Sequence, residues 1–240
     1  MSEQPPTTSS IRIAEALTKA SAVLRASGIA DARPDARALL SHTLARDHAF
    51  LVAHADEEIE PALYALYAER IARRAAGEPL QYITGRQEFY GLDFEVTPAV
   101  LIPRPETELL VEVALKLLPR EQSAPLLCDV GTGSGCIPVV LLHERRAARA
   151  FGLDISNAAL TVAARNAARH AVSERLTLLV SDCFDALTAS PPHAAPFTLI
   201  TSNPPYITES DFAQLQCEVR EHEPRFALTP GGDGLCVIRR

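Results

Sequence analysis

The clearest fold signal in the chain is the stretch Cys128-Asp129-Val130-Gly131-Thr132-Gly133-Ser134-Gly135. It follows an apolar run that is typical of a buried strand, and it opens a segment with the pattern of a helix. Glycines at alternate positions let the backbone turn sharply and approach a ligand closely. The stretch therefore predicts a strand, a ligand-binding turn and a helix, which together form the repeating unit of a parallel α/β sheet.

The spacing of these glycines argues against a dinucleotide as the ligand. A dinucleotide-binding fingerprint has its third glycine one position later, where this chain has Cys136. Asp129, which precedes the glycines, adds a carboxylate that suits a positively charged or amino-bearing ligand. A tight turn without any ligand is the alternative, and the loop favours the ligand.

Downstream of residue 104, helical and strand patterns alternate, as they do in proteins that cover a parallel sheet with helices. We expect a Rossmann-like α/β core in this part of the chain. Its strands are predicted near residues 125–130, 149–153, 175–180 and 197–202. Its helices are predicted near residues 106–118, 135–146 and 156–170.

The first hundred residues are organised differently. In residues 1–80, apolar side chains recur at helical spacing, and prolines and glycines fall at the predicted helix ends. We expect a small helical bundle with the apolar stripes in its core. Residues 81–103 are rich in strand-forming side chains such as Tyr82 and Ile83, which predicts a β-hairpin connector.

Two more polar positions follow predicted strands. Asp154 ends the second strand, where a carboxylate can accept hydrogen bonds from two ribose hydroxyls. An N-cap for the helix that starts near Ser156 is the alternative, and the neighbouring glycine loop favours the ribose. After the third strand, Asp182 precedes Cys183. A carboxylate there could accept a hydrogen bond from an exocyclic amine, although a plain turn is again the alternative.

The motif after the fourth predicted strand is Thr201-Ser202-Asn203-Pro204-Pro205-Tyr206. Two successive prolines fix the backbone and remove two N–H donors, so nearby carbonyls stay free to accept hydrogen bonds. Asn203 offers another acceptor, and Tyr206 offers an aromatic face. These groups suit a planar NH₂ group whose nitrogen is a poor nucleophile, because accepting both of its protons polarises and orients it. A ligand-free loop is a poor alternative at the carboxyl end of a strand in an open α/β sheet.

Composition narrows the possible classes of function. The 240 residues carry a formal net charge of -7, which argues against an enzyme that tracks a phosphate backbone. The five cysteines form no CxxC pair, so we expect neither a disulfide framework nor a metal site. The sequence shows no membrane-length apolar run and no targeting signal, so we expect a cytoplasmic protein with no membrane partner.

Several motifs together carry a resemblance that covers nearly the whole chain. They are Pro79-Leu80-Gln81-Tyr82-Ile83-Thr84-Gly85, Glu88-Phe89-Tyr90-Gly91-Leu92, Leu101-Ile102-Pro103-Arg104-Pro105-Glu106-Thr107-Glu108, Asp129 to Gly135, Asn203 to Tyr206, Glu223-Pro224, Ala227-Leu228 and Gly231-Gly232-Asp233-Gly234-Leu235. The chain resembles the class I S-adenosylmethionine-dependent methyltransferases and, more narrowly, the HemK/PrmC family of release-factor glutamine methyltransferases. The Asn-Pro-Pro-Tyr motif is shared with adenine methyltransferases of DNA, whereas the segment Ile102 to Glu108 is far more specific.

This resemblance implies S-adenosyl-L-methionine as the cofactor and residues 104–240 as the catalytic domain. It implies that the cofactor contacts Asp129, Gly131, Thr132, Gly133, Ser134, Gly135, Asp154, Asp182, Cys183 and Asn203. In this scheme the glycine loop lines the methionine part, Asp154 holds the ribose, and Asp182 and Cys183 flank the adenine. Cys183 stands where relatives often carry a larger side chain, so its contact is expected through the backbone.

The resemblance also implies a protein substrate. Asn203, Pro204, Pro205 and Tyr206 would bind the amide of the glutamine in the Gly-Gly-Gln motif of class 1 peptide chain release factors, and its N5 nitrogen would be methylated. The helical residues 1–80 would help to recognise this partner. We expect a monomer without a direct nucleic-acid partner. The family continues beyond Arg240, so we expect the C-terminal strands of the sheet to be missing and the catalytic domain to be incomplete.

Three alternatives stay open at this point. The substrate glutamine could belong to a ribosomal protein, although the segment Arg104 to Glu108 favours release factors. The target could instead be the N6 nitrogen of adenine in a nucleic acid, which the acidic net charge disfavours. A non-enzymatic chain that binds cofactor or partner weakly is the third alternative.

Overall fold

The computed structural model describes residues 11–118, 124–189 and 196–240. They divide into two compact units, with the boundary between Thr84 and Gly85. The sequence suggested three parts, 1–80, 81–103 and 104–240. In the structure, the helical unit extends to Thr84, and the hairpin that follows belongs to the second unit.

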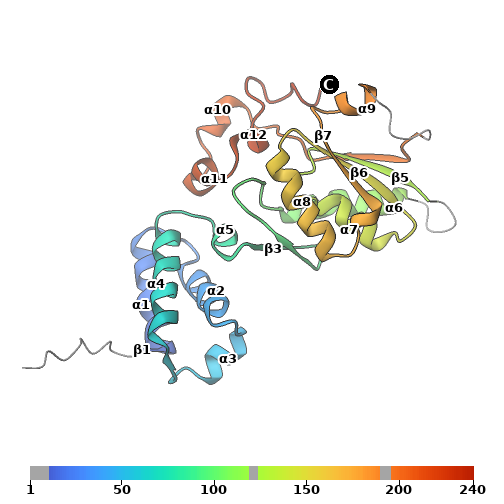
Figure 1. Cartoon of the computed structure of the whole chain (residues 1–240). Helices are drawn as coiled ribbons and strands as arrows, with labels where there is room; N and C mark the ends of the chain where they lie inside the picture. The colour runs from blue at the N-terminus through green and yellow to red at the C-terminus, as the bar shows by residue number, and fades with distance from the viewer. Residues whose placement is uncertain (1–10, 119–123, 190–195) are drawn as a thin grey trace, which may run out of the picture. The chain divides into compact units, whose positions relative to one another are not determined.

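The first unit is a bundle of short helices (Figure 1). Its helices are α1 (Ile13–Ala26), α2 (Ala32–Leu44), α3 (His48–Ala53), α4 (Pro61–Ala75) and α5 (Leu80–Thr84), and the short strands β1 (Ile11–Arg12) and β2 (Glu58–Ile59) pair antiparallel. Apolar stripes meet in a core that includes Leu24, Leu39 and Leu40. A buried ion pair joins Arg74 of α4 to Asp35 of α2 at 2.7 Å.

One local prediction for this part of the chain was wrong. Tyr82 and Ile83 have strand-forming side chains and were assigned to the hairpin connector, but both lie in helix α5. Both are buried, and Ile83 belongs to the core of the first unit. Burial against this core outweighs an intrinsic strand preference that is weak and dependent on context.

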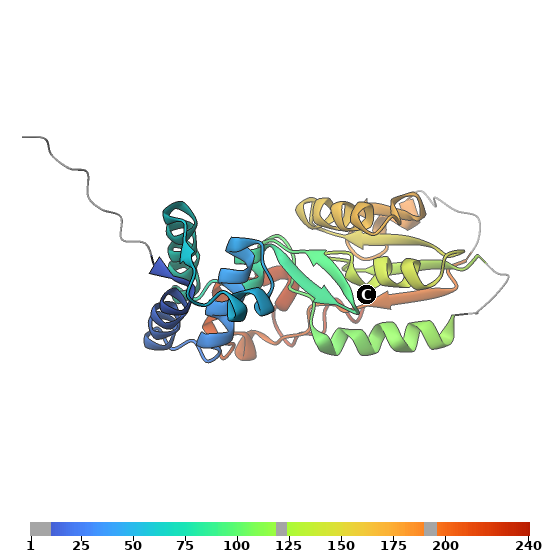
Figure 2. The same ribbon diagram turned by 90° about the horizontal axis from the view of Figure 1, so that it is seen from below.

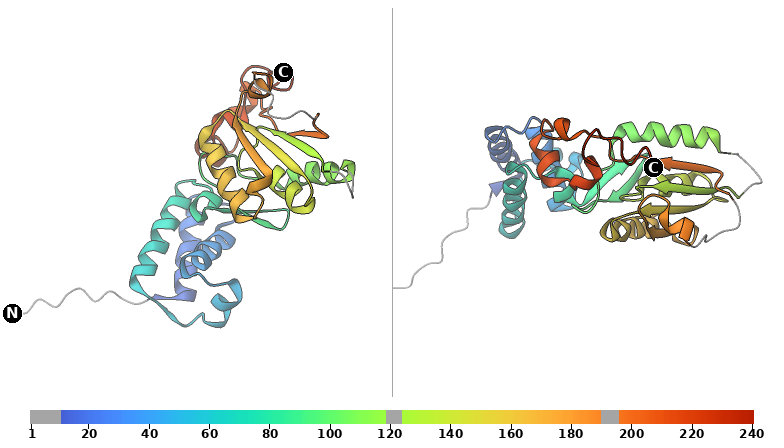
Figure 3. Two further views of the ribbon diagram at one scale, coloured as in Figure 1. Left: turned by 45° about the vertical axis from the view of Figure 1, so that its right-hand side comes forward. Right: turned by 90° about the horizontal axis from the view of Figure 1, so that it is seen from above.

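The second unit is built on a parallel sheet of four strands, in the order β7-β6-β5-β8 (Figure 3). The strands are β5 (Leu126–Val130), β6 (Arg149–Asp154), β7 (Leu176–Val180) and β8 (Leu199–Ser202), as the apolar runs predicted. The register pairs Asp129 with Gly152 on one side and with Thr201 on the other. The loops that follow these strands therefore emerge at the same edge of the sheet.

Helices α6 (Pro105–Leu117), α7 (Cys136–Glu144) and α8 (Asn157–Arg169) lie side by side along one face of this sheet (Figure 2). Their apolar side chains form the main core with Leu127, Ala150 and Leu176. The opposite face carries a smaller cluster that includes Leu187 of helix α9 (Asp185–Ala189).

A turn of 3-10 helix, Ser173–Arg175, precedes β7. After β8 come three short helices, α10 (Glu209–Phe212), α11 (Cys217–His222) and α12 (Arg225–Leu228). No helix in the described parts of the chain is long and apolar enough to span a membrane.

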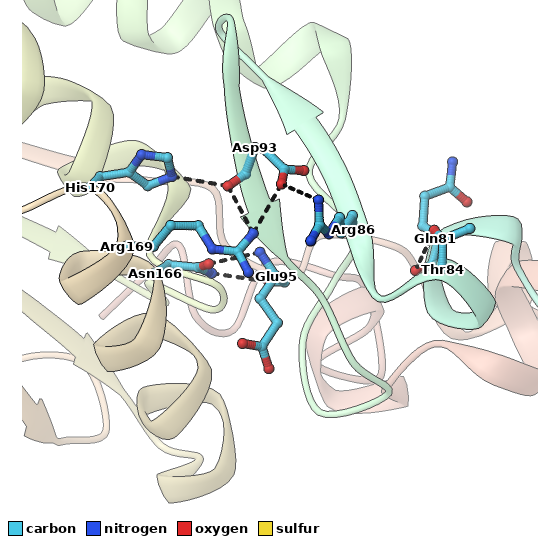
Figure 4. Close-up of polar contacts among 8 residues, drawn as sticks. All are labelled: Gln81, Thr84, Arg86, Asp93, Glu95, Asn166, Arg169 and His170. Carbon is cyan, nitrogen blue, oxygen red and sulfur yellow. Dashed lines mark hydrogen bonds and ion pairs between the residues drawn. The ribbon is translucent and has the colours of Figure 1, made fainter. Parts of the chain in front are cut away.

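Hydrogen bonds and an ion pair join the hairpin of β3 (Arg86–Phe89) and β4 (Leu92–Glu95) to α8 (Figure 4). The fully buried Asn166 accepts from the Glu95 N–H at 2.7 Å and donates to the Glu95 carbonyl at 3.0 Å. It also donates to the carbonyl of Ser134, in the glycine loop, at 2.9 Å. At the end of the hairpin, Arg169 forms an exposed ion pair with Asp93 at 3.0 Å. Asn166 thus connects the hairpin, α8 and the glycine loop.

We expect Asn166→Ala to lower the free energy of unfolding by about 3 kcal/mol or more, because it leaves three backbone groups without their partner. Arg169→Ala is the matched control, since removing an exposed ion pair costs about 0–1 kcal/mol. Urea denaturation of both variants measures the difference. Equal shifts of the two midpoints would contradict the special role of Asn166.

Candidate active site

A cavity of about 620 Å³ lies at the carboxyl ends of the strands. Among the residues that line it are most of those predicted to contact the cofactor, namely Gly131, Thr132, Gly133, Ser134, Asp154, Asp182, Cys183 and Asn203. The other two predicted residues, Asp129 and Gly135, are buried and do not line the cavity. The parallel register explains why loops far apart in sequence meet here.

The glycine loop owes its shape to backbone conformation. Gly131, Gly133 and Gly135 have φ angles of 73°, 54° and 77°, which residues with side chains rarely adopt. The N–H groups of Gly131 and Thr132 both donate to the carbonyl of Leu153, at 2.8 and 2.9 Å. Gly135 has a second constraint, because a Cβ there would lie 3.0 Å from that of Ala163 in α8. The loop is thus held against β6 and α8.

Asp154 supports the same loop. Its Oδ2 accepts from the Gly133 N–H at 2.8 Å, and its Oδ1 accepts from the Ser156 N–H at 2.9 Å. Ser156, rather than Asp154, is the N-cap of α8, since its hydroxyl accepts from the Ala159 N–H. Burial raises the pKa of the Asp154 carboxyl, and the two backbone N–H groups oppose that shift. Each oxygen keeps acceptor capacity toward the cavity that Asp154 lines.

Asp129 is buried beneath the loop, with 1% of its surface exposed. Thr201 in the neighbouring strand donates its hydroxyl to Asp129 Oδ1 at 2.7 Å. The other oxygen, Oδ2, has no hydrogen-bond partner among the described residues. Burial raises the pKa of this carboxyl to about 7, although the hydroxyls of Thr201 and the nearby Thr132 oppose the shift. A buried acceptor without a partner suits an amino-bearing ligand in the adjoining cavity.

The loop after β7 offers both side-chain and backbone groups. Asp182 lines the cavity and pairs with Arg240, so its carboxylate already has a cationic partner. Cys183 has a φ of 47°, and its carbonyl accepts from the Ser181 hydroxyl at 2.8 Å. This bond holds the tight turn and leaves Cys183 at the cavity wall.

A second cavity, of about 580 Å³, adjoins the first. Pro204 and Tyr206 line the second cavity alone, whereas Asn203 and Pro205 line both. Among the described residues, no backbone N–H donates to the carbonyl oxygens of Asn203 and Pro204. The two cavities therefore share the neutral residues Asn203 and Pro205 in their lining, and Pro204 belongs to the second cavity.

Thr107 is a site residue that sequence reasoning did not single out. Asn203 Nδ2 donates to Thr107 Oγ1 at 3.2 Å, and both residues line both cavities. With its NH₂ group held in this way, the Asn203 side chain turns its Oδ1 acceptor away from Thr107. Thr107 stands in the motif from Ile102 to Glu108, but no sequence pattern reveals its contact with a residue so far along the chain.

The segment that follows α10 contacts the residues around Asn203 to Tyr206. Glu223 is buried, pairs with Arg104 and accepts from the Ile102 N–H at 3.2 Å. Gly234, at φ 78°, lies against the backbone of Tyr206, where an added Cβ would come within 2.3 Å of the carbonyl oxygen. The family motifs at both ends of this unit therefore meet around Asn203 to Tyr206. Within the described residues, no group of His, Cys, Asp and Glu is arranged to hold a metal ion.

Comparison with known proteins identifies the class to which this protein belongs. The model of the methyltransferase small domain matches residues 106–240, and the model of the PrmC N-terminal domain matches residues 15–85. The fold and the match over the second unit define a methyltransferase, with S-adenosylmethionine as its cofactor.

Relatives identify the family more closely. The chain is 46% identical to the release factor glutamine methyltransferase of Cereibacter sphaeroides, over 95% of this chain and 78% of that one. It is 43% identical to the enzyme of the same name from Nitratidesulfovibrio vulgaris, over 96% and 76% of the two chains. For that of Geobacter sulfurreducens the identity is 45%, over 88% and 71%. The chain therefore belongs to the family of release factor glutamine methyltransferases, which confirms the family predicted from its motifs.

The raised pKa of Asp129 predicts how stability depends on pH. Because its folded-state pKa of about 7 exceeds the ordinary 3.8, the folded chain binds this proton more tightly than the unfolded chain. That stabilisation is complete below about pH 4 and is lost as pH rises through about 7. The free energy of unfolding of the wild type, relative to Asp129→Asn, should fall over this range by on the order of 4 kcal/mol.

Urea denaturation at a series of pH values tests this expectation. Asparagine keeps an oxygen acceptor for the Thr201 hydroxyl but does not titrate, so Asp129→Asn isolates the ionisation. A constant difference between the two proteins from pH 4 to 8 would show that Asp129 has no raised pKa.

Thr107→Val should lower turnover by about tenfold, because the valine has the same shape but cannot accept the hydrogen bond that fixes Asn203. Thr107→Ser keeps the hydroxyl and should stay within about threefold of wild type. Single-turnover methylation at saturating cofactor and substrate measures both variants. If the valine variant matches the serine variant, Thr107 does not orient Asn203.

Proposed function

We propose that this chain transfers a methyl group from S-adenosyl-L-methionine to the side-chain amide nitrogen N5 of the glutamine in the Gly-Gly-Gln motif of a class 1 peptide chain release factor. The observation that carries the proposal is the shared wall of two adjoining cavities. Asn203, Pro205 and Thr107 line both of them. A group in one cavity can therefore face a group in the other across a fixed set of neutral acceptors.

The first cavity fits the cofactor. When bound, S-adenosylmethionine supplies an activated methyl group on a sulfonium centre. The open glycine loop would hold its methionine part, with the buried carboxylate of Asp129 as a partner for the amino group. Asp154 would accept from the ribose hydroxyls with its remaining lone pairs. The turn at Asp182 and Cys183 would flank the adenine.

The second cavity fits a primary amide. An amide nitrogen is a weak nucleophile because its lone pair is delocalised into the carbonyl group. The Asn203 side-chain oxygen and the Pro204 carbonyl would accept its two protons, which orients the lone pair and polarises the N–H bonds. Methylation leaves positive charge on the nitrogen and makes its proton acidic, so a carbonyl or water can take that proton. No carboxylate base is required.

The charges around the second cavity favour a protein over a nucleic acid. Leu110, Leu215 and Val219 line it, and the one cationic residue among its described lining is Arg104. The Arg104 guanidinium already pairs with the buried Glu223. A site that read a nucleotide would need free cations for the phosphates on either side of the base. A glutamine side chain on an extended loop needs none.

Mass spectrometry of an intact release factor after incubation with enzyme and cofactor tests the proposed function. The expected product carries one added methyl group on the Gly-Gly-Gln glutamine. The same release factor with that glutamine replaced by alanine is the control and should gain none. Methylation at another residue, or of RNA instead of the release factor, would overturn the proposal.

Asn203→Ala should cut turnover by a factor on the order of 10²–10³, as does loss of one preorganised polar contact to the reacting group. Cofactor affinity should stay within a few-fold of wild type, because the glycine loop and Asp154 are untouched. Asn157→Ala, which removes an exposed amide outside both cavities, is the matched control. Single-turnover kinetics and calorimetric titration of the cofactor separate the two effects. Turnover within a few-fold of wild type would assign the orienting role to another group.

A further inference from the structure

A cluster of arginines lies at the amino ends of the strands in the second unit. Arg145 and Arg146 follow helix α7, Arg149 is the first residue of β6, and Arg175 directly precedes β7. Strands β6 and β7 are parallel neighbours, so the segments that lead into them meet at one edge of the sheet. The cavities lie at the opposite edge, where the strands end, and none of these arginines lines either cavity.

Backbone hydrogen bonds hold the two segments together. Arg175 Nη1 donates to the carbonyls of Arg145 and Ala148, at 3.2 Å each. In return, Arg149 Nη2 donates to the carbonyl of Glu174 at 3.2 Å. A guanidinium has further N–H donors beyond these, so both groups are fixed in place and keep donors for a ligand. A side chain that is already held loses less conformational entropy when it binds.

The positive charge of the cluster is not neutralised by the fold. In the described parts of the chain, Arg146, Arg149 and Arg175 form no ion pair with a carboxylate. The carboxylates nearest to them in the chain belong to Glu144 and Glu174, which are exposed and pair with none of the three. Arg146 is also exposed, and no hydrogen bond within the described residues occupies its guanidinium.

Repulsion between these like charges is visible at Arg175. Burial lowers the pKa of its guanidinium, and repulsion from Arg146 and Arg149 lowers that pKa further. An arginine nevertheless stays charged at any ordinary pH, so the repulsion is not relieved by loss of a proton. An anion bound among the three guanidinium groups would relieve it, which favours a negatively charged ligand.

The residues around the charges indicate which anion fits. Residues 145–149 and 173–175 contain no large apolar side chain. A protein interface combines charged pairs with an apolar core, whereas a phosphate backbone is bound mainly by cations and N–H donors. The lack of apolar contact therefore favours phosphate groups over an acidic protein segment.

We propose that Arg146, Arg149 and Arg175 bind the phosphate backbone of a nucleic acid. The net charge of -7 argues against such a partner for the chain as a whole, but it averages over all residues and does not describe a local cluster. Guanidinium groups match phosphate oxygens in a bidentate geometry. Because the cluster and the cavities lie at opposite edges of the sheet, this binding goes beyond the proposed function and does not depend on it.

Fluorescence anisotropy with a labelled single-stranded RNA oligonucleotide tests the proposal on the full chain. For Arg146→Glu/Arg149→Glu we expect the Kd to rise by about tenfold or more, and the slope of log Kd against log salt concentration to become shallower by about 1.4 as two phosphate contacts are lost. The milder Arg146→Gln/Arg149→Gln should raise the Kd by a smaller factor. Arg175 stays unchanged because its hydrogen bonds hold the two segments together.

Arg33→Glu/Arg37→Glu is the matched control, because it makes the same change of net charge beside a cationic cavity of the first unit. Its Kd should stay within about threefold of wild type, since both arginines lie outside the proposed site. Circular dichroism and the urea midpoint check that each variant folds.

The remaining outcomes would overturn the proposal. A wild type that does not bind the RNA, or a Kd that the cluster variant leaves unchanged, would show that the arginines bind no nucleic acid. An equal loss in the control would mean that the RNA responds only to net charge or binds the first unit. Displacement of the RNA by polyglutamate as readily as by unlabelled RNA at the same ionic strength would assign the cluster to an acidic protein.

Discussion

The hydrogen bond between Thr201 and Asp129 joins the two strands on which the candidate active site depends. It is 2.7 Å long, buried, and formed by residues that lie opposite each other in the register of β5 and β8. The glycine loop begins two residues after Asp129, and Asn203 follows two residues after Thr201. Because a slip of this register would separate the two loops, the bond fixes the spacing between the cofactor cavity and the amide-binding wall.

Longer connections hold the two loops from outside the sheet. Asn166 ties the carbonyl of Ser134 to the hairpin, so the position of the glycine loop depends on α8 and β4 together. On the other side, the buried Glu223 ties the segment at Arg104 to the end of the chain that packs on Tyr206. Both devices use buried polar groups that are costly to leave without a partner, which gives each loop one preferred position.

The sequence predicted the parts of the fold that local pattern determines. Apolar runs placed all four strands, and the residues after them indicated the loops that line the two cavities, since parallel strands bring those loops to one edge. The connection from Thr107 to Asn203 was not predictable, because residues 96 apart meet only through the packing of α6 beside β8. Helix α5 was missed for a related reason, since the core of the first unit decides the conformation of Tyr82 and Ile83.

Neutral acceptors around the amide have a chemical advantage over a carboxylate. A carboxylate beside the amide would accept its protons well, but it would itself be a stronger nucleophile toward an activated methyl group. In this chain Asp154 accepts two backbone N–H bonds, and Glu223 is held by Arg104. Glu106 lines the second cavity but not the wall that it shares with the first. The acceptors left around the amide are the oxygens of Asn203, at the shared wall, and of Pro204, in the second cavity. They can polarise an amide without competing with it for the methyl group.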